Sequence, residues 1–147
     1  MGRISGPLMD RFDLRIEVPP VACGDLDLPA SGETSAIVAA RVAAARGRQE
    51  ARYADDPGTL CNADATGETL DRFATPDAEG RALLKGVAER FSLSARGYHR
   101  VLRVARTIAD LDGDETVSRA HVAEAIGFRL VRPPRDAAPP TASKLSA

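Results

Sequence analysis

A single strand-like segment stands ahead of an otherwise helical sequence, and this combination constrains the fold more than any other feature. In RFDLRIEV, residues 11–18, polar residues alternate strictly with Phe, Leu, Ile and Val. This period of two predicts a half-buried strand, and Pro19 and Pro20 end it because proline cannot donate to a strand ladder. One strand cannot pair its own backbone or bury its own apolar face. We therefore expect a sheet supplied by other polypeptide.

From residue 35 onward the apolar residues recur with helical spacing. We expect four or five helices: a long one from Ser35 towards Tyr53, with Ile37, Val38, Val42 and Ala45 at its apolar positions, a short one carrying Leu70 and Phe73, and those that follow Asp77, Ser94 and Ser118. Ser94 and Ser118 can cap the helices that follow them, and Asp77 places an acid at the positive end of its helix. Gly113 suits the end of the helix that begins after Ser94. Leu83, Leu84, Val87 and Phe91 are expected to form the buried stripe of the helix after Asp77. The fold class is mainly α, a helical bundle preceded by one strand.

Composition fits one ordinary soluble domain. The chain has 147 residues and a formal net charge of -1, which excludes a strongly basic nucleic-acid binder. No apolar stretch approaches the roughly 20 residues of a membrane span, and the N-terminus has no apolar run typical of a signal peptide. We expect a cytoplasmic protein. The proline-rich residues 132–147 are predicted to be disordered, since they offer too little apolar area to offset their chain entropy.

The helix predicted over residues 95–111 carries the most chemistry. Its arginines, at positions 96, 100, 103 and 106, gather opposite an apolar stripe of Tyr98, Val101, Leu102, Ala105, Ile108 and Ala109. Such a face is often only solvated, and this reading stays open. Arg96 differs because it lies in the first turn, where free backbone N–H groups and a guanidinium together suit a phosphate.

The remaining motifs do not predict a metal or a self-contained active site. The two cysteines, 23 and 61, and the two histidines, 99 and 121, lack zinc-ligand spacing. The acidic residues around position 112 resemble a calcium loop, but Glu115 stands where that loop must turn on glycine. No G-x-x-x-x-G-K-[ST] pattern is present, so this chain has no P-loop to hold the phosphates of a nucleotide.

Two long segments carry a family resemblance. RISGPLMDRFDLRIEVPP, residues 3–20, and LSARGYHRVLRVARTIADLDG, residues 93–113, closely resemble the C-terminal part of the YifB/ComM proteins, which are AAA+ ATPases of the magnesium-chelatase-like group. SAIVAARVAAARGRQ, TLCNAD and HVAEAIGFR are similar to the same family, so the likeness covers roughly residues 3–131. It implies that residues 1–30 end an AAA+ core with its last strand. Residues 31–131 would then form the helical lid that packs over the nucleotide.

The resemblance also implies roles for the arginines. Arg11 matches the arginine finger, which reaches the γ-phosphate bound by a neighbouring subunit, and Arg96 matches the sensor 2 arginine, which detects the γ-phosphate. Arg100 is a weaker candidate for nucleotide binding, and Arg103 and Arg106 are weaker candidates for DNA contacts. We expect no metal site among these residues.

The implied function is that of a lid in a hexameric motor that remodels its substrate or drives DNA branch migration. ATP and Mg²⁺ belong to the complete ATPase, whose P-loop core or subunits are the expected partners. This chain alone is expected to bind no cofactor and to hydrolyse no ATP. The alternative is a free-standing helical module that binds nucleic acid or protein through the arginine face of residues 95–111. Such a module would bind DNA unaided, with an affinity that falls steeply as salt rises.

Overall fold

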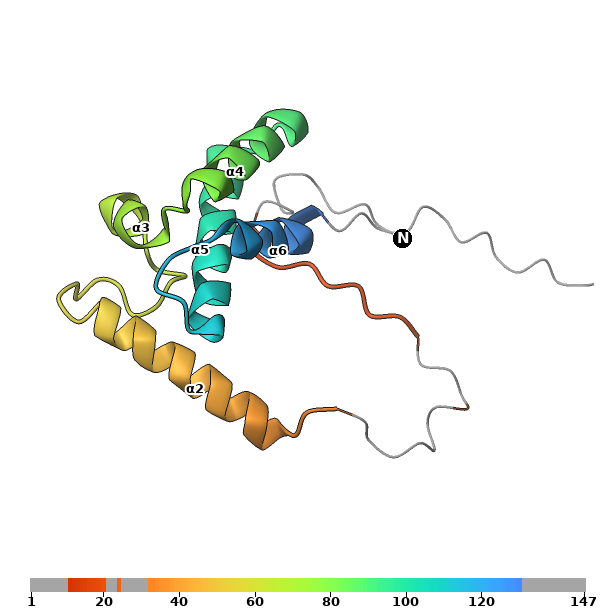
Figure 1. Cartoon of the computed structure of the whole chain (residues 1–147), viewed down its shortest axis with the longest axis vertical. Coiled ribbons are helices and arrows are strands. Elements are labelled where there is room, and N and C mark those ends of the chain that lie inside the picture. Colours follow the sequence, from red (N-terminus) through yellow and green to blue (C-terminus); the bar gives the residue numbers. More distant parts are fainter. Residues whose placement is uncertain (1–10, 21–23, 25–31, 131–147) are drawn as a thin grey trace, which may run out of the picture.

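Five helices form the regular structure of residues 11–20, 24 and 32–130, the part of the chain that the computed structural model describes. They are α2 (Ser35–Arg52), α3 (Gly67–Ala74), α4 (Ala78–Phe91), α5 (Ala95–Asp112) and α6 (Arg119–Leu130). The helix α5 is central: α2, α3 and α6 pack against it, and α4 packs against α6 (Figure 1). The predicted mainly α bundle is confirmed.

The ends of α5 follow from two local signals. At the start, the Ser94 hydroxyl accepts a hydrogen bond from the Gly97 N–H at 3.1 Å. At the end, Gly113 adopts a left-handed φ of 87°, and its N–H donates to the carbonyl of Ala109. Only glycine enters this region without a steric cost from Cβ. Both boundaries match the sequence prediction.

The core lies between α5, α6 and α4. Val101, Ala105 and Ala109 place the apolar stripe of α5 in this core, and Leu84 of α4 and Val122 of α6 are fully buried against it. Alanines at the contact let the helix backbones approach closely. The bundle therefore needs few aromatic residues.

The starts of α4 and α6 are joined. The Asp77 N–H donates to the carbonyl of Val117 at 2.9 Å, and the Asp77 carboxylate caps α4 by accepting from the Gly80 N–H at 2.6 Å. At α6, the ring Nδ1 of His121 accepts from the Ser118 N–H at 3.0 Å. This is the geometry of a capping box, in which a side chain three residues into the helix reaches back to the cap residue.

Residues 11–20 belong to no strand ladder among the described residues, so the predicted strand lacks here the sheet that we expect other polypeptide to supply. Leu14 is 50% exposed, and exposure rises to 70% at Ile16 and 82% at Val18. The apolar side chains of this segment lack the sheet on which a half-buried strand depends.

The predicted buried stripe of α4 is wrong at one position. Phe91 is 49% exposed and therefore lies outside the buried stripe of α4, because it falls in the last turn, where its ring lies beside the Arg90 guanidinium. Along α2, only Ala45 of the four predicted apolar positions is buried. The first turns of α2 extend beyond the rest of the bundle (Figure 1), which leaves their apolar side uncovered.

Some predictions fall outside the described residues. These are the disorder of residues 132–147, the state of Cys23, and most of the segment 1–30. Within the described part of the chain, no helix combines the length and the apolar character that crossing a lipid bilayer requires.

Candidate functional site

Arg96 lies exposed in the first turn of α5, where the backbone N–H groups have no partner within the helix. The Ser94 side chain accepts from the N–H of Gly97. Across the described residues, no hydrogen bond or ion pair involves the Arg96 side chain. A guanidinium at this end opposes the helix dipole, and an anion bound between the two would relieve that repulsion. The side chain is therefore available to an anion such as phosphate.

The other three arginines of α5 already have partners. Arg100 forms an ion pair with Asp13 at 2.5 Å, and the Nε of Arg103 donates to the carbonyl of Ala65 at 2.8 Å. Arg106 is 1% exposed, so its predicted place on the solvent face is wrong and it does not present a surface to DNA. It is buried because the chain turns back after α5 and lays the Glu115 carbonyl against it at 2.6 Å.

This division of the arginines weakens the alternative of a free-standing nucleic-acid-binding module. Such a module needs a continuous basic surface to neutralise several phosphates at once. Of the four arginines on α5, Arg96 alone is exposed. The helix therefore offers one accessible guanidinium at its start and no arginine stripe.

Arg11 is exposed at the beginning of the described N-terminal segment. Two residues later, Asp13 pairs with Arg100 of α5, and further on the Arg15 N–H donates to the carbonyl of Phe128 in α6 at 2.9 Å. Arg100 stands one helical turn after Arg96. The contact with Asp13 therefore brings the segment that carries Arg11 against the end of α5 that carries Arg96.

A buried polar network joins α2, the loop after it and α5. The carboxylate of Asp110, which is fully buried, accepts hydrogen bonds from the guanidinium groups of Arg52 and Arg106 and from the Asn62 amide at 2.8 Å. The Asn62 carbonyl oxygen accepts from the Tyr53 hydroxyl at 2.8 Å. The network fixes the position of α2 on α5. Asp110 is also the one buried acid among residues 110–115, the acidic segment whose sequence does not fit a calcium loop.

These contacts set the charge state of Asp110. Burial alone would raise the pKa of Asp110, but hydrogen bonds from Arg52 and Asn62 and the charges of Arg106 and Arg52 hold that pKa below its ordinary value of 3.8. For the Tyr53 hydroxyl, burial outweighs the lowering effect of Arg52 and Arg106 and raises its pKa above 10.0. Asp110 is therefore a carboxylate at neutral pH and holds two cations in the interior.

Sequence reasoning found only a turn at TLCNAD, residues 59–64, where the structure places Asn62 at the centre of the network. Its partners Thr107 and Asp110 lie 45 and 48 residues further along the chain. Cys61 is half-buried, and its thiol donates to the Asp64 carboxylate at 3.3 Å. An asparagine among turn residues gives no local signal for such distant partners, although burial of a polar side chain demands them.

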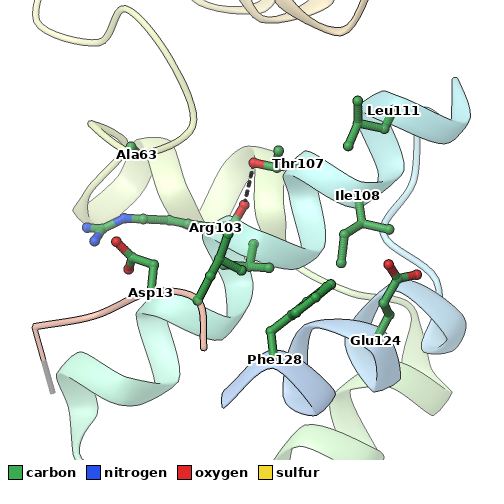
Figure 2. A pocket seen from close by; sticks show the side chains of 10 residues that line it. Asp13, Ala63, Arg103, Thr107, Ile108, Leu111, Glu124 and Phe128 are labelled. Carbon is green, nitrogen blue, oxygen red and sulfur yellow. Dashed lines mark hydrogen bonds between the residues drawn. The ribbon is translucent and has the colours of Figure 1, made fainter. Parts of the chain in front are cut away.

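An open apolar groove lies where the N-terminal segment meets α5 and α6. It encloses about 330 Å³, and its apolar lining includes Leu14, Val104 and Ile108. Figure 2 shows the Phe128 ring facing this part of α5, with Glu124 at one end. The segment and the two helices thus leave apolar surface uncovered at their junction.

Comparison with known proteins gives the class of this chain. Residues 32–129 match the family described as magnesium chelatase, subunit ChlI C-terminal, and the chain belongs to that family. The matched region starts just before α2 and ends one residue before the end of α6, so it covers nearly the whole helical bundle.

The relatives are longer proteins. The chain is 39% identical over 132 residues to "Competence protein ComM" of Haemophilus influenzae and 38% identical over the same length to "Uncharacterized protein YifB" of Escherichia coli, which covers 89% of this chain in both cases. It is 37% identical over 129 residues to an uncharacterized protein of Mycobacterium tuberculosis. The chain spans about a quarter of the length of each relative. The resemblance to the C-terminal region of YifB/ComM proteins is confirmed.

Proposed function

We propose that this chain acts as the helical lid of a YifB/ComM-like AAA+ ATPase. Arg96 is the sensor 2 residue that contacts the γ-phosphate of ATP, and Arg11 is the arginine finger that reaches an ATP bound by a neighbouring subunit. A P-loop core, in a hexameric assembly in the cytoplasm, holds the ATP and its Mg²⁺. The closing and opening of the lid would drive remodelling of a substrate, with DNA branch migration as the reaction that the family resemblance implies.

The observation that carries the proposal is the state of Arg96. It is exposed at the N-terminal end of α5, whereas Arg100 pairs with a carboxylate and Arg106 is buried inside the bundle. A cation left beside free backbone N–H groups costs stability unless an anion binds there. A phosphate group of the size and charge of the γ-phosphate satisfies both the guanidinium and the helix end.

The test is ATP turnover by a chimera in which this chain replaces the matching C-terminal quarter of Escherichia coli YifB. Arg96→Ala and Arg11→Ala should each lower kcat by about 100-fold, the loss that follows removal of one donor to transition-state charge. Arg81→Ala, at an exposed arginine of α4, is the matched control and should leave kcat unchanged. Circular dichroism on each variant checks that the helices are intact.

Unchanged turnover in Arg96→Ala would remove the sensor assignment. Unchanged turnover in Arg11→Ala would remove the finger and leave the sensor standing. Binding of a fluorescent ATP analogue separates the two effects further. Loss of the finger should leave binding intact, since it acts on the charge that develops during phosphoryl transfer.

A further inference from the structure

Polar contacts, more than apolar burial, hold the N-terminal segment to the bundle. Its apolar side chains are at least half exposed, apart from the 47% exposure of Phe12, so the area they bury is small. Against this, the Arg15 N–H donates to the Phe128 carbonyl at 2.9 Å, and Asp13 pairs with Arg100. The geometry of the segment is therefore set by a few identifiable groups on α5 and α6.

Arg129 adds a third contact. This α6 side chain is only 5% exposed, and its Nη1 donates to the Phe12 carbonyl at 3.5 Å. The guanidinium lies directly on Gly97, where a Cβ would come within 2.7 Å of Nη2. Gly97 therefore leaves the space through which Arg129 passes from α6, across the start of α5, to the backbone beside Arg11.

This arrangement gives a reason for a glycine that otherwise weakens α5. Glycine inside a helix costs conformational entropy relative to alanine. Gly97 is the residue immediately after Arg96 and is buried. The first turn of α5 thus gives up helix propensity at the point where the Arg129 guanidinium must fit.

We infer that Arg129, seated on Gly97, and Arg100, paired with Asp13, form a clamp that makes the segment carrying Arg11 move with the end of α5 carrying Arg96. This inference rests on the proposed function, because it links the finger and the sensor of one subunit. The clamp residues are positioning residues and touch no nucleotide. A change in the contact of Arg96 with one γ-phosphate would displace Arg11 at the next site.

Gly97→Ala tests the clamp with little risk to the fold. The three atoms nearest the new methyl group all belong to the far end of the flexible Arg129 side chain, so the guanidinium is displaced while the helix gains propensity. Gly86→Ala is the matched control, since a Cβ at this exposed α4 glycine meets nothing within 4 Å.

The first readout is amide hydrogen exchange on the full 147-residue chain. Gly97→Ala should speed exchange of the Arg15 amide by about 10-fold. A loss of protection of this size is typical of breaking a local contact without global unfolding. Gly86→Ala should leave that amide unchanged, and the melting temperature of Gly97→Ala should not fall. Unchanged exchange at Arg15 in Gly97→Ala overturns the clamp.

A charge exchange gives an independent check of the second contact. Arg100→Asp should speed exchange of the Arg15 amide, and the double variant Arg100→Asp with Asp13→Arg should restore it, because the ion pair is rebuilt with its charges reversed. A loss without restoration means that Arg100 acts through packing alone, which overturns its part in the clamp.

The ATPase chimera separates this inference from the function on which it rests. If Arg96→Ala lowers turnover and Gly97→Ala lowers kcat with KM unchanged, both stand. If Arg96→Ala lowers turnover and Gly97→Ala has no effect on kcat, the coupling role is overturned and the lid function remains. If Arg96→Ala has no effect but exchange at Arg15 responds to Gly97→Ala, the sensor assignment fails and the structural link stands.

Discussion

At the scale of single residues, Asp110 is the buried carboxylate that neutralises two guanidinium groups. It holds the guanidinium groups of Arg52 and Arg106, so two positive charges face one carboxylate inside the bundle. The excess positive charge is tolerated because these groups lie at the C-terminal end of α5, where the helix dipole is negative. Arg48 donates to the Asp110 carbonyl at 3.0 Å, and the carbonyls after α5 accept from Arg106. The carboxylate and the helix end thus share the neutralisation.

Removing the charge of Asp110 should destabilise the bundle strongly. We expect Asp110→Asn to lower the free energy of unfolding by about 3 kcal/mol, since loss of one partner leaves a buried guanidinium without its counter-ion. Urea unfolding followed by circular dichroism measures the change. Asp71→Asn, at an exposed carboxylate of α3, is the control and should stay within about 0.5 kcal/mol of the parent chain. Equal midpoints for the two variants would contradict the role of Asp110.

The same carboxylate predicts how stability depends on pH. The pKa of Asp110 in the folded chain lies below its ordinary value of 3.8, so the folded state binds fewer protons than the unfolded state under acid conditions. Its contribution is complete above the unfolded pKa and is lost as the pH falls through the lower, folded pKa. The free energy of unfolding should therefore fall below about pH 5.

Urea titrations at pH 7, 5 and 3 check this dependence. Asp56, whose pKa is lowered by hydrogen bonds from Thr69 and Thr59, adds to the acid slope at the surface. The comparison of the parent chain with Asp110→Asn isolates the buried carboxylate, because both chains share the other acids. The difference in unfolding free energy between the two should shrink from pH 7 to pH 3. A difference that stays constant would mean that Asp110 is not the titrating group.

At the scale of elements, local sequence signals were sufficient to predict where the helices begin and end. They were not sufficient to predict which side of each helix is buried. Caps and breakers such as Ser94 and Gly113 act within a few residues, so the boundaries of α5 could be predicted from the sequence. Helical periodicity also placed Val101 and Ala109 in the core. It failed for Arg106, because a wheel projection contains no information about the loop that returns over that face.

The polar network and the clamp could not be predicted for a related reason. Asn62 and Arg129 become informative only when their partners, 48 and 117 residues away along the chain, are brought into contact. The sequence does contain two residues that look unfavourable until these contacts are known. They are Gly97, a glycine inside α5, and Asp110, an acid on a helix that carries four arginines. The family resemblance drew attention to Arg11 and Arg96, but their bonding state required the structure.

At the scale of the whole molecule, the described residues expose groups of apolar side chains in two places besides the groove. One is the outer side of the N-terminal segment, and the other is the first half of α2, where Ile37 is 54% exposed. Exposed apolar side chains grouped on elements that lack a packing partner are typical of surfaces that other polypeptide covers. The chain spans about a quarter of the length of its relatives, which is consistent with further protein against these faces.

Joining the chain to an AAA+ core should therefore give the N-terminal segment the strand hydrogen bonds that it lacks here. In the 147-residue chain, the amides of Ile16, Glu17 and Val18 have no described backbone partner and should exchange at nearly the rate of an unfolded peptide. In the chimera with Escherichia coli YifB, the same amides should gain strand hydrogen bonds and exchange about 100-fold more slowly. The amides of residues 101–109, inside α5, should be protected in both proteins and act as the internal standard. Equal exchange of residues 16–18 in the two proteins would contradict the strand assignment. Slow exchange in the chain alone, when sedimentation shows it to be monomeric, would also contradict it, because a single strand has no partner for its backbone hydrogen bonds.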